Sequence, residues 1–334
     1  MPSVLVRLRP SGPWRIGPDS GDRDRVDRIY HSDALYSAVS GAMARLGDLA
    51  EWLDATARQE IPAVRLSSCF PFHGESLYVV PPRHVWPPAA SSKVRWKGAR
   101  FVPLKVVEAV LSRQPLSEDA WVVDGESECL LPSSAAGAAL FKSSVRSYAA
   151  IDRAGEAVVT HSSGCLEFTP GSGLWFLATF ASQAAFDQWN ARVRAAVRLL
   201  ADSGFGGGRS RGWGRSEAPE FTENPSLLPE AAEGVETGHW MLSLFHPAAG
   251  DGVDWRRGDY SMITRGGRVE SEAGSGGEKK NTRMIAEGSV LVSGAEPTGS
   301  AADVAPDGFE HPVYRAGFAV SLRVPLTPPV GPAV

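Results

Sequence analysis

The order of apolar patterns along the chain constrains its fold more than any other feature of the sequence. Residues 2–10 alternate apolar and polar side chains, as a half-buried strand does. The segment 33–46 then spaces its apolar side chains three and four apart and stops before Gly47, which is typical of a helix with one apolar face. Ser32 or Asp33 is expected to cap this helix, and a second helical stretch should follow it directly.

The pattern then continues through the rest of the first half. A tight strand pair is predicted at 67–82, and a further strand at 174–180. A helix is predicted at 183–203, ended by Gly204, and another strand after it. Strand, helix, two strands, helix and strand is the βαββαβ order of a ferredoxin-like unit.

The second half contains four strand-like runs with little helix between them, which predict a second, degenerate unit of the same kind. We therefore expect an α+β protein with two ferredoxin-like units of the RRM type in tandem. A glycine-rich stretch at 274–280 is predicted to be a flexible loop. The expected parts are a first unit at 1–222 with an irregular insertion at about 85–153, a linker at 223–238, a second unit at 239–325 and a disordered tail at 326–334.

Composition narrows the class of protein. The chain has 334 residues, of which 43% are hydrophobic and 22% charged, so it can bury a large core in more than one domain. No apolar run reaches the roughly 18 residues of a membrane span, and the first residues lack the apolar region of a signal peptide, so we expect a cytosolic protein without a membrane partner. The three cysteines lie far apart and outside any CxxC pair, which favours buried thiols over disulfides or zinc ligands.

Charge is unevenly distributed along the chain. The formal net charge of −4 argues weakly against a nucleic-acid partner. No acid, however, lies between Glu75 and Glu108, where basic residues stand among tryptophans, and Arg209 and Arg211 lie close to Trp213. Local faces can therefore be strongly positive, although such clusters can also be ordinary solvated surface.

The segment 204–214 carries six glycines and two arginines between a predicted helix and strand. Glycines let backbone N–H groups approach an anion closely, and arginines supply forked donors for phosphate oxygens. The segment lacks the GxxxxGK[ST] pattern of a Walker loop, and it follows a helix where a Rossmann fingerprint follows a strand. A helix cap would need only one or two glycines. We therefore predict that the segment cradles a sugar-phosphate backbone, while Trp213 can either stack on a base or pack in the core.

The start of the first helix, Tyr30-His31-Ser32-Asp33, is a second candidate site. A helix N-terminus offers unpaired N–H groups to a phosphate, and His31 and Ser32 can add donors. His31 could also act as a general acid or base, and Asp33 could activate a 2′-hydroxyl or hold a metal. The sequence has no HExxH motif, zinc-ligand array or paired carboxylates, so binding is favoured over catalysis.

Several segments resemble, in order, the motifs of one known family. HSDALYSAVSGAM is similar to its first-helix motif, RLSSCFPFHGESLYVVPP to its Ser-Ser-x-Phe-Pro segment, and GFGGGRSRGWGR to its glycine-rich loop. YSMITRGGRVES, MIAEGSVL and HPVYRAG are similar to its second-domain signatures. The chain thus resembles the RAMP-superfamily subunit that caps the guide-RNA 5′ end in the type III-A CRISPR (Csm) effector complex.

The resemblance implies a non-catalytic subunit, without cofactor or metal, that binds the repeat-derived 5′ tag of the guide RNA in antiviral defence. It also implies docking to the large polymerase-cyclase subunit and to the first backbone RAMP subunit. A hairpin thumb near the first guide–target base pairs, which the resemblance places in the insertion, would give indirect contact with target RNA. The RNA-binding residues expected are His31, Ser32, Lys142, Arg146, Arg153, Gly206, Gly207, Gly208, Arg209, Ser210, Arg211 and Trp213.

Other functions remain open at this point. A guide-RNA-processing endoribonuclease of the same superfamily would use His31, and its cleavage of repeat RNA would be lost on His31→Ala. A target-RNA nuclease relying on Asp33 is less favoured, because in the family that role belongs to a paralogous backbone protein. A purely structural scaffold subunit would use the glycine-rich segment only for packing, and would keep its affinity for guide RNA when Arg209 and Arg211 become alanine.

Overall fold

The computed structural model describes residues 1–18, 22–88, 94–151, 158–230, 234–271 and 274–327. These residues form an α+β architecture of mainly antiparallel sheets with few helices. The α-helices are α1 (Ser32–Leu46), α2 (Leu49–Ala55), α3 (Leu104–Leu111) and α4 (Gln183–Ser203). The strands of the first half are β1 (Ser3–Leu8), β2 (Val64–Leu66), β3 (Phe70–His73), β4 (Ser76–Val79), β5 (Val102–Pro103), β6 (Trp121–Val123), β7 (Leu130–Pro132), β8 (Phe141–Ile151), β9 (Val158–Phe168), β10 (Ser172–Phe180) and β11 (Glu220–Glu223). Those of the second half are β12 (Thr237–Met241), β13 (Met262–Arg265), β14 (Arg268–Ser271), β15 (Gly274–Glu278), β16 (Thr282–Ile285), β17 (Val290–Leu291), β18 (Gly299–Asp303), β19 (Tyr314–Phe318) and β20 (Ser321–Pro325).

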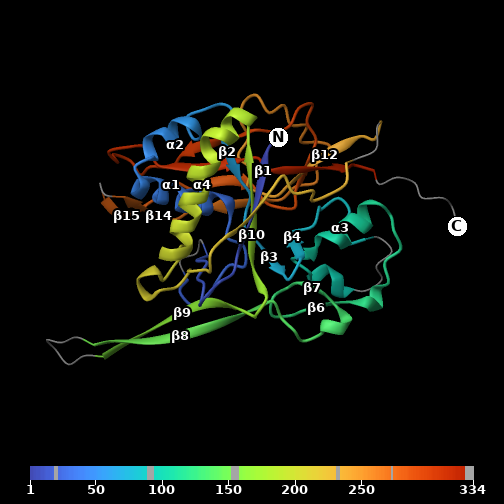
Figure 1. Cartoon of the computed structure of the whole chain (residues 1–334), viewed down its shortest axis with the longest axis horizontal. Helices are drawn as coiled ribbons and strands as arrows, with labels where there is room; N and C mark the ends of the chain where they lie inside the picture. The colour runs from blue at the N-terminus through green and yellow to red at the C-terminus, as the bar shows by residue number, and fades with distance from the viewer. Residues whose placement is uncertain (19–21, 89–93, 152–157, 231–233, 272–273, 328–334) are drawn as a thin grey trace.

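A seven-stranded antiparallel sheet is the centre of the first half. β1 lies between β10 and β11, β2 and β3 pair with the other edge of β10, and β4 and β5 continue the sheet. Every residue of β10 except Thr179 is buried, so the sheet is covered on both faces at this strand. Helices α1 and α4 pack against each other and lie with α2 on one side of β1 and β10 (Figure 1).

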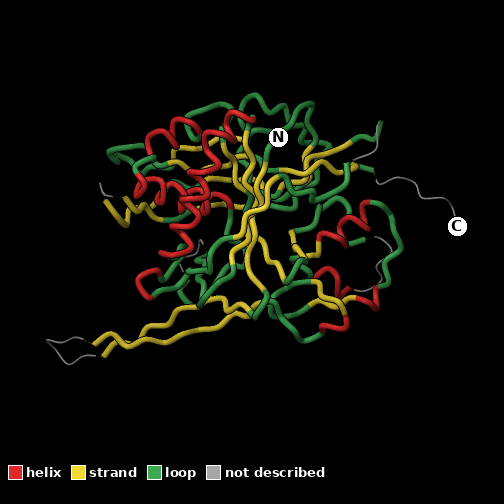
Figure 2. The backbone as a smooth tube through the Cα atoms, viewed as in Figure 1, coloured by secondary structure: helices red, strands yellow, loops and turns green. Residues whose placement is uncertain are grey.

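The insertion predicted to be irregular is in fact ordered over most of its described length. It contains α3, strands β5 to β7, and β8, which pairs with β9 from Phe141↔Phe168 to Ile151↔Val158. This long hairpin extends away from the body (Figures 1 and 2). The sequence pattern missed β8 because this strand has no buried face over most of its length: no residue from Lys142 to Ala149 is buried.

The second half is built from strands, and its described residues contain no α-helix. β12 lies between β17 and β20, while β13 pairs with β16 and β18 with β19. The prediction of a flexible loop at 274–280 is wrong, because Gly274–Glu278 forms β15 and pairs with β14. Backbone pairing gives this glycine-rich stretch its structure without any pattern of apolar side chains.

One hydrophobic cluster extends from the first half into the second. It joins Val4 and Trp175 of the central sheet to Trp240 and Phe318, all of them buried. The indole nitrogen of Trp240 also donates a hydrogen bond to the carbonyl oxygen of Val80, at 3.1 Å. The two halves therefore share a core, and their relative position is set by packing.

Two simpler predictions can be compared with the structure. All three cysteines are buried and free, as expected from their spacing. Over the ranges given above, no helix has both the length and the apolar character that a membrane crossing requires.

Candidate nucleic-acid interface

The glycine-rich loop 204–214 folds back on the N-terminal segment. Five of its six glycines have φ between +76° and +84°, a region that residues with a side chain rarely adopt. A Cβ at Gly206 would lie 2.6 Å from the carbonyl oxygen of Arg15, and one at Gly208 would lie 2.7 Å from the ring of Trp213. The expectation that the glycines exceed what the local structure needs is therefore wrong, since backbone path and close packing account for most of them.

The exposed part of the loop is a short turn, Arg209–Arg211, flanked by glycines in the left-handed conformation. The backbone amides of Gly208 and Ser210 have no hydrogen-bond partner among the described residues. The guanidinium carbon of Arg211 lies 3.8 Å from the centre of the Tyr148 ring on β8. The turn thus presents amides and cations outward, and it contacts the projecting hairpin.

Trp213, one of the predicted RNA contacts, points inward. It is only 6% exposed and packs under Gly208, with its ring centre 6.1 Å from that of Tyr148. Of the two roles that the sequence left open, the structure favours core packing over stacking on a base.

Helix α1 begins differently from the prediction. His31 is its N-cap residue, without a side-chain cap, and Ser32 and Asp33 lie inside the first turn. The Ser32 hydroxyl accepts a hydrogen bond from the amide of Leu244, at 3.0 Å. The polar side chains of this turn contact residues of the second half, more than two hundred positions further along the chain. None of them makes a side-chain cap for the helix.

His31 is held between two carboxylates in the interior. Its Nδ1 lies 2.7 Å from Glu287 and its Nε2 lies 3.2 Å from Asp27, and the hydroxyl of Ser68 also donates to Glu287. Burial alone would lower the pKa of His31, but the charge of Glu287 and the hydrogen bonds to Asp27 and Glu287 outweigh it and raise that pKa to about 9. The ring is therefore a buried imidazolium that donates from both nitrogens.

Asp33 is paired with two arginines of the second half. Arg315 donates to one carboxylate oxygen at 2.5 Å, and Arg265 donates to both oxygens at 3.1 Å. Burial would raise the pKa of Asp33, but the charges of the two guanidinium groups hold it below its ordinary value. Both carboxylate oxygens are thus occupied, and no group of residues that could hold a metal ion occurs in the described part of the chain.

These contacts change the assignment of the first-helix motif. His31 and Ser32 are 3% and 4% exposed, so the prediction that their side chains contact RNA is not supported by their position. Their partners are Glu287, Asp27 and Leu244, and their observed role is to join the first half to the second.

The start of α1 and the glycine-rich loop nevertheless meet at one surface hollow, which we call the α1 cavity. Its volume is about 460 Å³. Six of its side chains are cationic, and Asp33 is the single acid among the lining residues. A second hollow of about 640 Å³ adjoins it, lined by Arg45, Ser203, Gly204 and loop residues 206–210. The residues that line the α1 cavity are Tyr30, Asp33, Ala34, Ser37, Ala38, Gly41, Ala42, Arg45, Leu200, Ser203, Gly204, Phe205, Gly206, Arg209, Arg265, Gly266, Arg268, Lys279, Tyr314 and Arg315.

Most of the cations of this cavity were not among the residues predicted from the sequence. Arg265, Arg268, Lys279 and Arg315 come from the second half, from β13, β14, the end of β15 and β19. Three of the four stand in segments that carried the family resemblance, YSMITRGGRVES and HPVYRAG. Nothing in their spacing connects them to residues near position 30, and only the fold brings the two regions together.

The remaining predicted contacts belong to the hairpin. Lys142 and Arg146 are exposed on β8, and both pair with Glu167 of β9, at 3.7 and 2.5 Å. Their net positive charge lies on the side of the molecule that also carries Tyr148 and Arg211. The predicted contact Arg153 lies outside the described residues.

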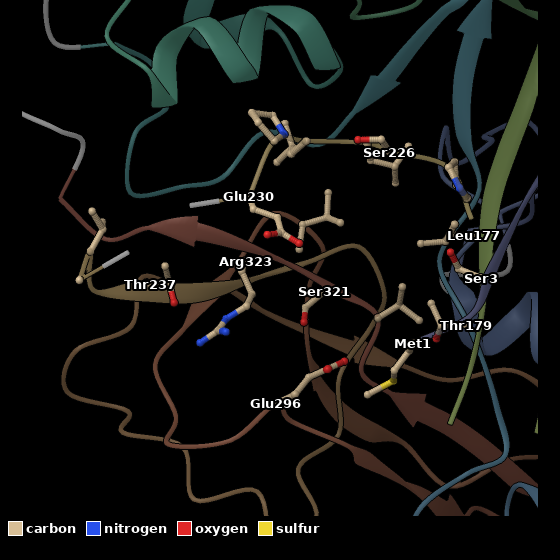
Figure 3. Close-up of a pocket in the computed structure, with 18 residues that line it drawn as sticks. Met1, Ser3, Leu177, Thr179, Ser226, Glu230, Thr237, Glu296, Ser321 and Arg323 are labelled. Carbon is tan, nitrogen blue, oxygen red and sulfur yellow. The ribbon is translucent and has the colours of Figure 1, made fainter. Parts of the chain in front are cut away.

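A larger cavity of about 770 Å³ lies between the central sheet and β20 (Figure 3). Its charged lining residues are Arg323, Glu230 and Glu296. Two acids against one cation do not favour a polyanion. The α1 cavity and the glycine-rich loop are therefore the better candidate for a nucleic-acid interface.

The chain is similar in sequence to known proteins of one family. The family model of the CRISPR Csm4 C-terminal domain matches residues 236–324. The CRISPR system protein Csm4 of Thermococcus onnurineus (strain NA1) is 24% identical over 338 residues, with 97% of each chain covered.

Solved structures match the chain over almost its whole length. A chain of the Csm3–Csm4 subcomplex of the type III-A CRISPR–Cas interference complex is 16% identical with a TM-score of 0.65, covering 97% of this chain and 100% of that one. A chain of the Csm1–Csm4 cassette in complex with cA4 is 21% identical with a TM-score of 0.58, covering 99% and 100%. Residues 236–324 thus match the Csm4 C-terminal domain, and the whole chain is similar in sequence and in fold to Csm4 proteins.

Proposed function

We propose that this chain is the non-catalytic subunit that holds the 5′ tag of the guide RNA in a type III-A CRISPR effector complex used in antiviral defence. The observation that carries the proposal is the α1 cavity, where the glycine-rich loop and the first helix meet among six cationic side chains and one acid. Outward amides and arginines bind the backbone of a single strand without needing an activated nucleophile.

The partners follow from the solved relatives. Csm4 is found with Csm1 in one set of structures and with Csm3 in another. We infer that this chain likewise docks a large subunit of the polymerase-cyclase type and the first backbone RAMP subunit. Guide RNA would run from the α1 cavity into the assembly.

The β8–β9 hairpin is the proposed thumb. It extends from the body and is joined to the glycine-rich loop by the stacking of Arg211 on Tyr148. The exposed cations Lys142 and Arg146 would lie near the first guide–target base pairs. Contact with target RNA would therefore be indirect, through the guide duplex.

The burial of His31 supports binding over cleavage. Its two ring nitrogens both face carboxylates, and its pKa is raised to about 9, so at neutral pH it has no lone pair with which to take a proton from RNA. A nuclease that relies on His31 would need this ring at the surface.

The fold assignment can also be taken further. The antiparallel order β11–β1–β10–β2, with α1 and α4 as connections, supports one ferredoxin-like unit in residues 1–222 with an insertion. We infer a second, degenerate unit at 239–325, reached through a linker at 223–238. The central position of β12 between β17 and β20 supports this division.

Arg209 and Arg211 provide the direct test. Changing both to alanine is expected to weaken binding of a single-stranded guide RNA about tenfold to a hundredfold at moderate salt. The reason is that a charge-assisted hydrogen bond contributes about 1.5–3 kcal/mol when it is partly shielded from solvent, and less when it is fully exposed. If each arginine neutralises one phosphate, the slope of log affinity against log salt should fall by about 1.4 in magnitude. Fluorescence anisotropy across a salt series measures both quantities.

The control is a second pair of exposed arginines in another loop. Arg256→Ala with Arg257→Ala removes the same charge from two exposed residues that do not line the α1 cavity. Equal affinity and salt slope for both double variants would favour a scaffold that binds no RNA at this loop.

A further inference from the structure

We infer that the α1 cavity holds one whole nucleotide of the guide RNA, turned out of the strand, with its base against helix α1 and its phosphate at the cationic rim. This inference rests on the function proposed above, because it specifies how that RNA is held. A volume of about 460 Å³ lies within the range of pockets that enclose small ligands, and it exceeds what a phosphate alone would need.

Five of the seven α1 residues that line the cavity have small side chains, and the other two are Asp33 and Arg45. Ala34, Ser37, Ala38, Gly41 and Ala42 all line the cavity. A Cβ built at Gly41 would have no atom within 4 Å, so packing does not require glycine there. Glycine is the least favourable residue of a helix interior after proline, and its use in the middle of α1 therefore keeps space free at a cost in helix stability.

A buried donor in the same cavity points to a ligand. Arg315 is 6% exposed and lines the cavity, and its Nε has no hydrogen-bond partner among the described residues. Its two terminal nitrogens are used by Asp33 and by the carbonyl oxygen of Gly266. Buried donors are normally satisfied, so an acceptor atom from a bound molecule would complete this group.

The chemistry of the remaining lining residues fits a nucleotide. Arg45, Arg209 and Arg268 are exposed cations at the cavity, suited to phosphate oxygens. Half-buried Tyr314 offers an aromatic ring to a base. Single-stranded RNA is recognised in this way by many proteins, which splay out a base and stack it on a side chain.

Filling the cavity without touching a charge is the test. Gly41→Leu places a side chain in the open space, and it should also raise helix propensity, so the full-length protein is expected to fold. Ala38→Leu is a second filling variant. The matched control is Ala44→Leu, which adds a leucine to an exposed position of α1 outside the cavity. The probe is a labelled single-stranded RNA that carries the repeat-derived tag, together with a series of the same RNA in which each tag position in turn is abasic.

The wild-type protein and Ala44→Leu should lose about tenfold or more in affinity at one particular abasic position, the size expected for one stacked base. Gly41→Leu should bind the intact RNA about as weakly as the wild type binds that abasic RNA, and should lose nothing further at that position. An unchanged affinity in both filling variants, or an abasic profile identical to that of the wild type, would overturn the inference.

The same assay separates this inference from the proposed function. If the Arg209 and Arg211 double variant weakens binding while the filling variants do not, RNA binds at the loop and no nucleotide occupies the cavity. Free 5′-AMP is expected to bind the wild type only weakly and to compete with the RNA. Tight AMP binding that leaves the RNA in place would instead reveal a separate mononucleotide site and would contradict the inference.

Discussion

Replacing Asp33 by alanine is expected to lower the free energy of unfolding by about 3–5 kcal/mol, because it leaves two buried guanidinium groups without their counter-charge. Arg265 and Arg315 are 7% and 6% exposed, and both donate to the Asp33 carboxylate. A buried ionic cluster adds little stability compared with apolar residues of the same volume. Removing one member nevertheless lowers stability strongly, because the remaining charges stay buried without a partner. Urea unfolding at pH 7 measures the change.

A surface ion pair on the neighbouring helix is the control. Asp54→Ala breaks the pair with Arg58, in which both side chains are largely exposed. Such pairs contribute up to about 1 kcal/mol. The loss of stability for Asp33→Asn should lie between those for Asp33→Ala and Asp54→Ala, because the amide keeps one acceptor oxygen but not the charge. A loss for Asp33→Ala no larger than that for Asp54→Ala would show that the arginines find other partners.

The stability of the protein is expected to fall as pH rises from about 6.5 to about 9, and His31 is the reason. The pKa of this group is raised in the folded state to about 9 from an ordinary value of 6.5. Its contribution is therefore complete below pH 6.5 and is lost as pH approaches 9, with a limit on the order of 3 kcal/mol. Asp27 and Glu287 have lowered pKa values, so their contribution is lost only under acid conditions.

Between pH 6.5 and 8 the fall in stability can be assigned to His31, because the other shifted histidines affect stability only at lower pH. Burial lowers the pKa values of His84, His239 and His246, and their effect on stability appears below pH 6.5. In His31→Gln the unfolding free energy should be lower at pH 6.5 and nearly constant between pH 7 and 8. Above that range the thiols of Cys69 and Cys129, whose pKa values are raised by burial, lower the stability of both proteins. An alkaline slope equal to that of the wild type in this variant would assign the effect to another group.

Both predictions concern the same structural role. His31, Ser32 and Asp33 each contact the second half, through Glu287, Leu244 and the pair Arg265 with Arg315. These contacts also position two cations of the α1 cavity. The first-helix motif would thus act on RNA through the placement of the second half, while the outward groups of the glycine-rich loop contact the strand.

The elements that sequence predicted well are those with a local cause. The apolar spacing of α1 and α4 and the glycines at positions 47 and 204 fixed both helices, and the runs in β3, β4 and β10 fixed those strands. Strands β8 and β15 were missed because neither carries an alternation of apolar side chains, and their structure comes from backbone pairing with β9 and β14. Backbone pairing does not require a periodic pattern of apolar residues, so the sequence carries no such signal for these strands.

The sequence by itself determined the positions of α1, α4 and the central strands β1, β3, β4 and β10, the burial of the cysteines and the presence of an arginine-bearing glycine turn. Only the tertiary structure decided which polar residues face outward. His31 and Asp33 sit at a helix start that could as well have met solvent, but their partners in the second half lie 232 to 282 residues away. Ion pairs depend on distance in space, and neither local propensity nor periodicity carries that information.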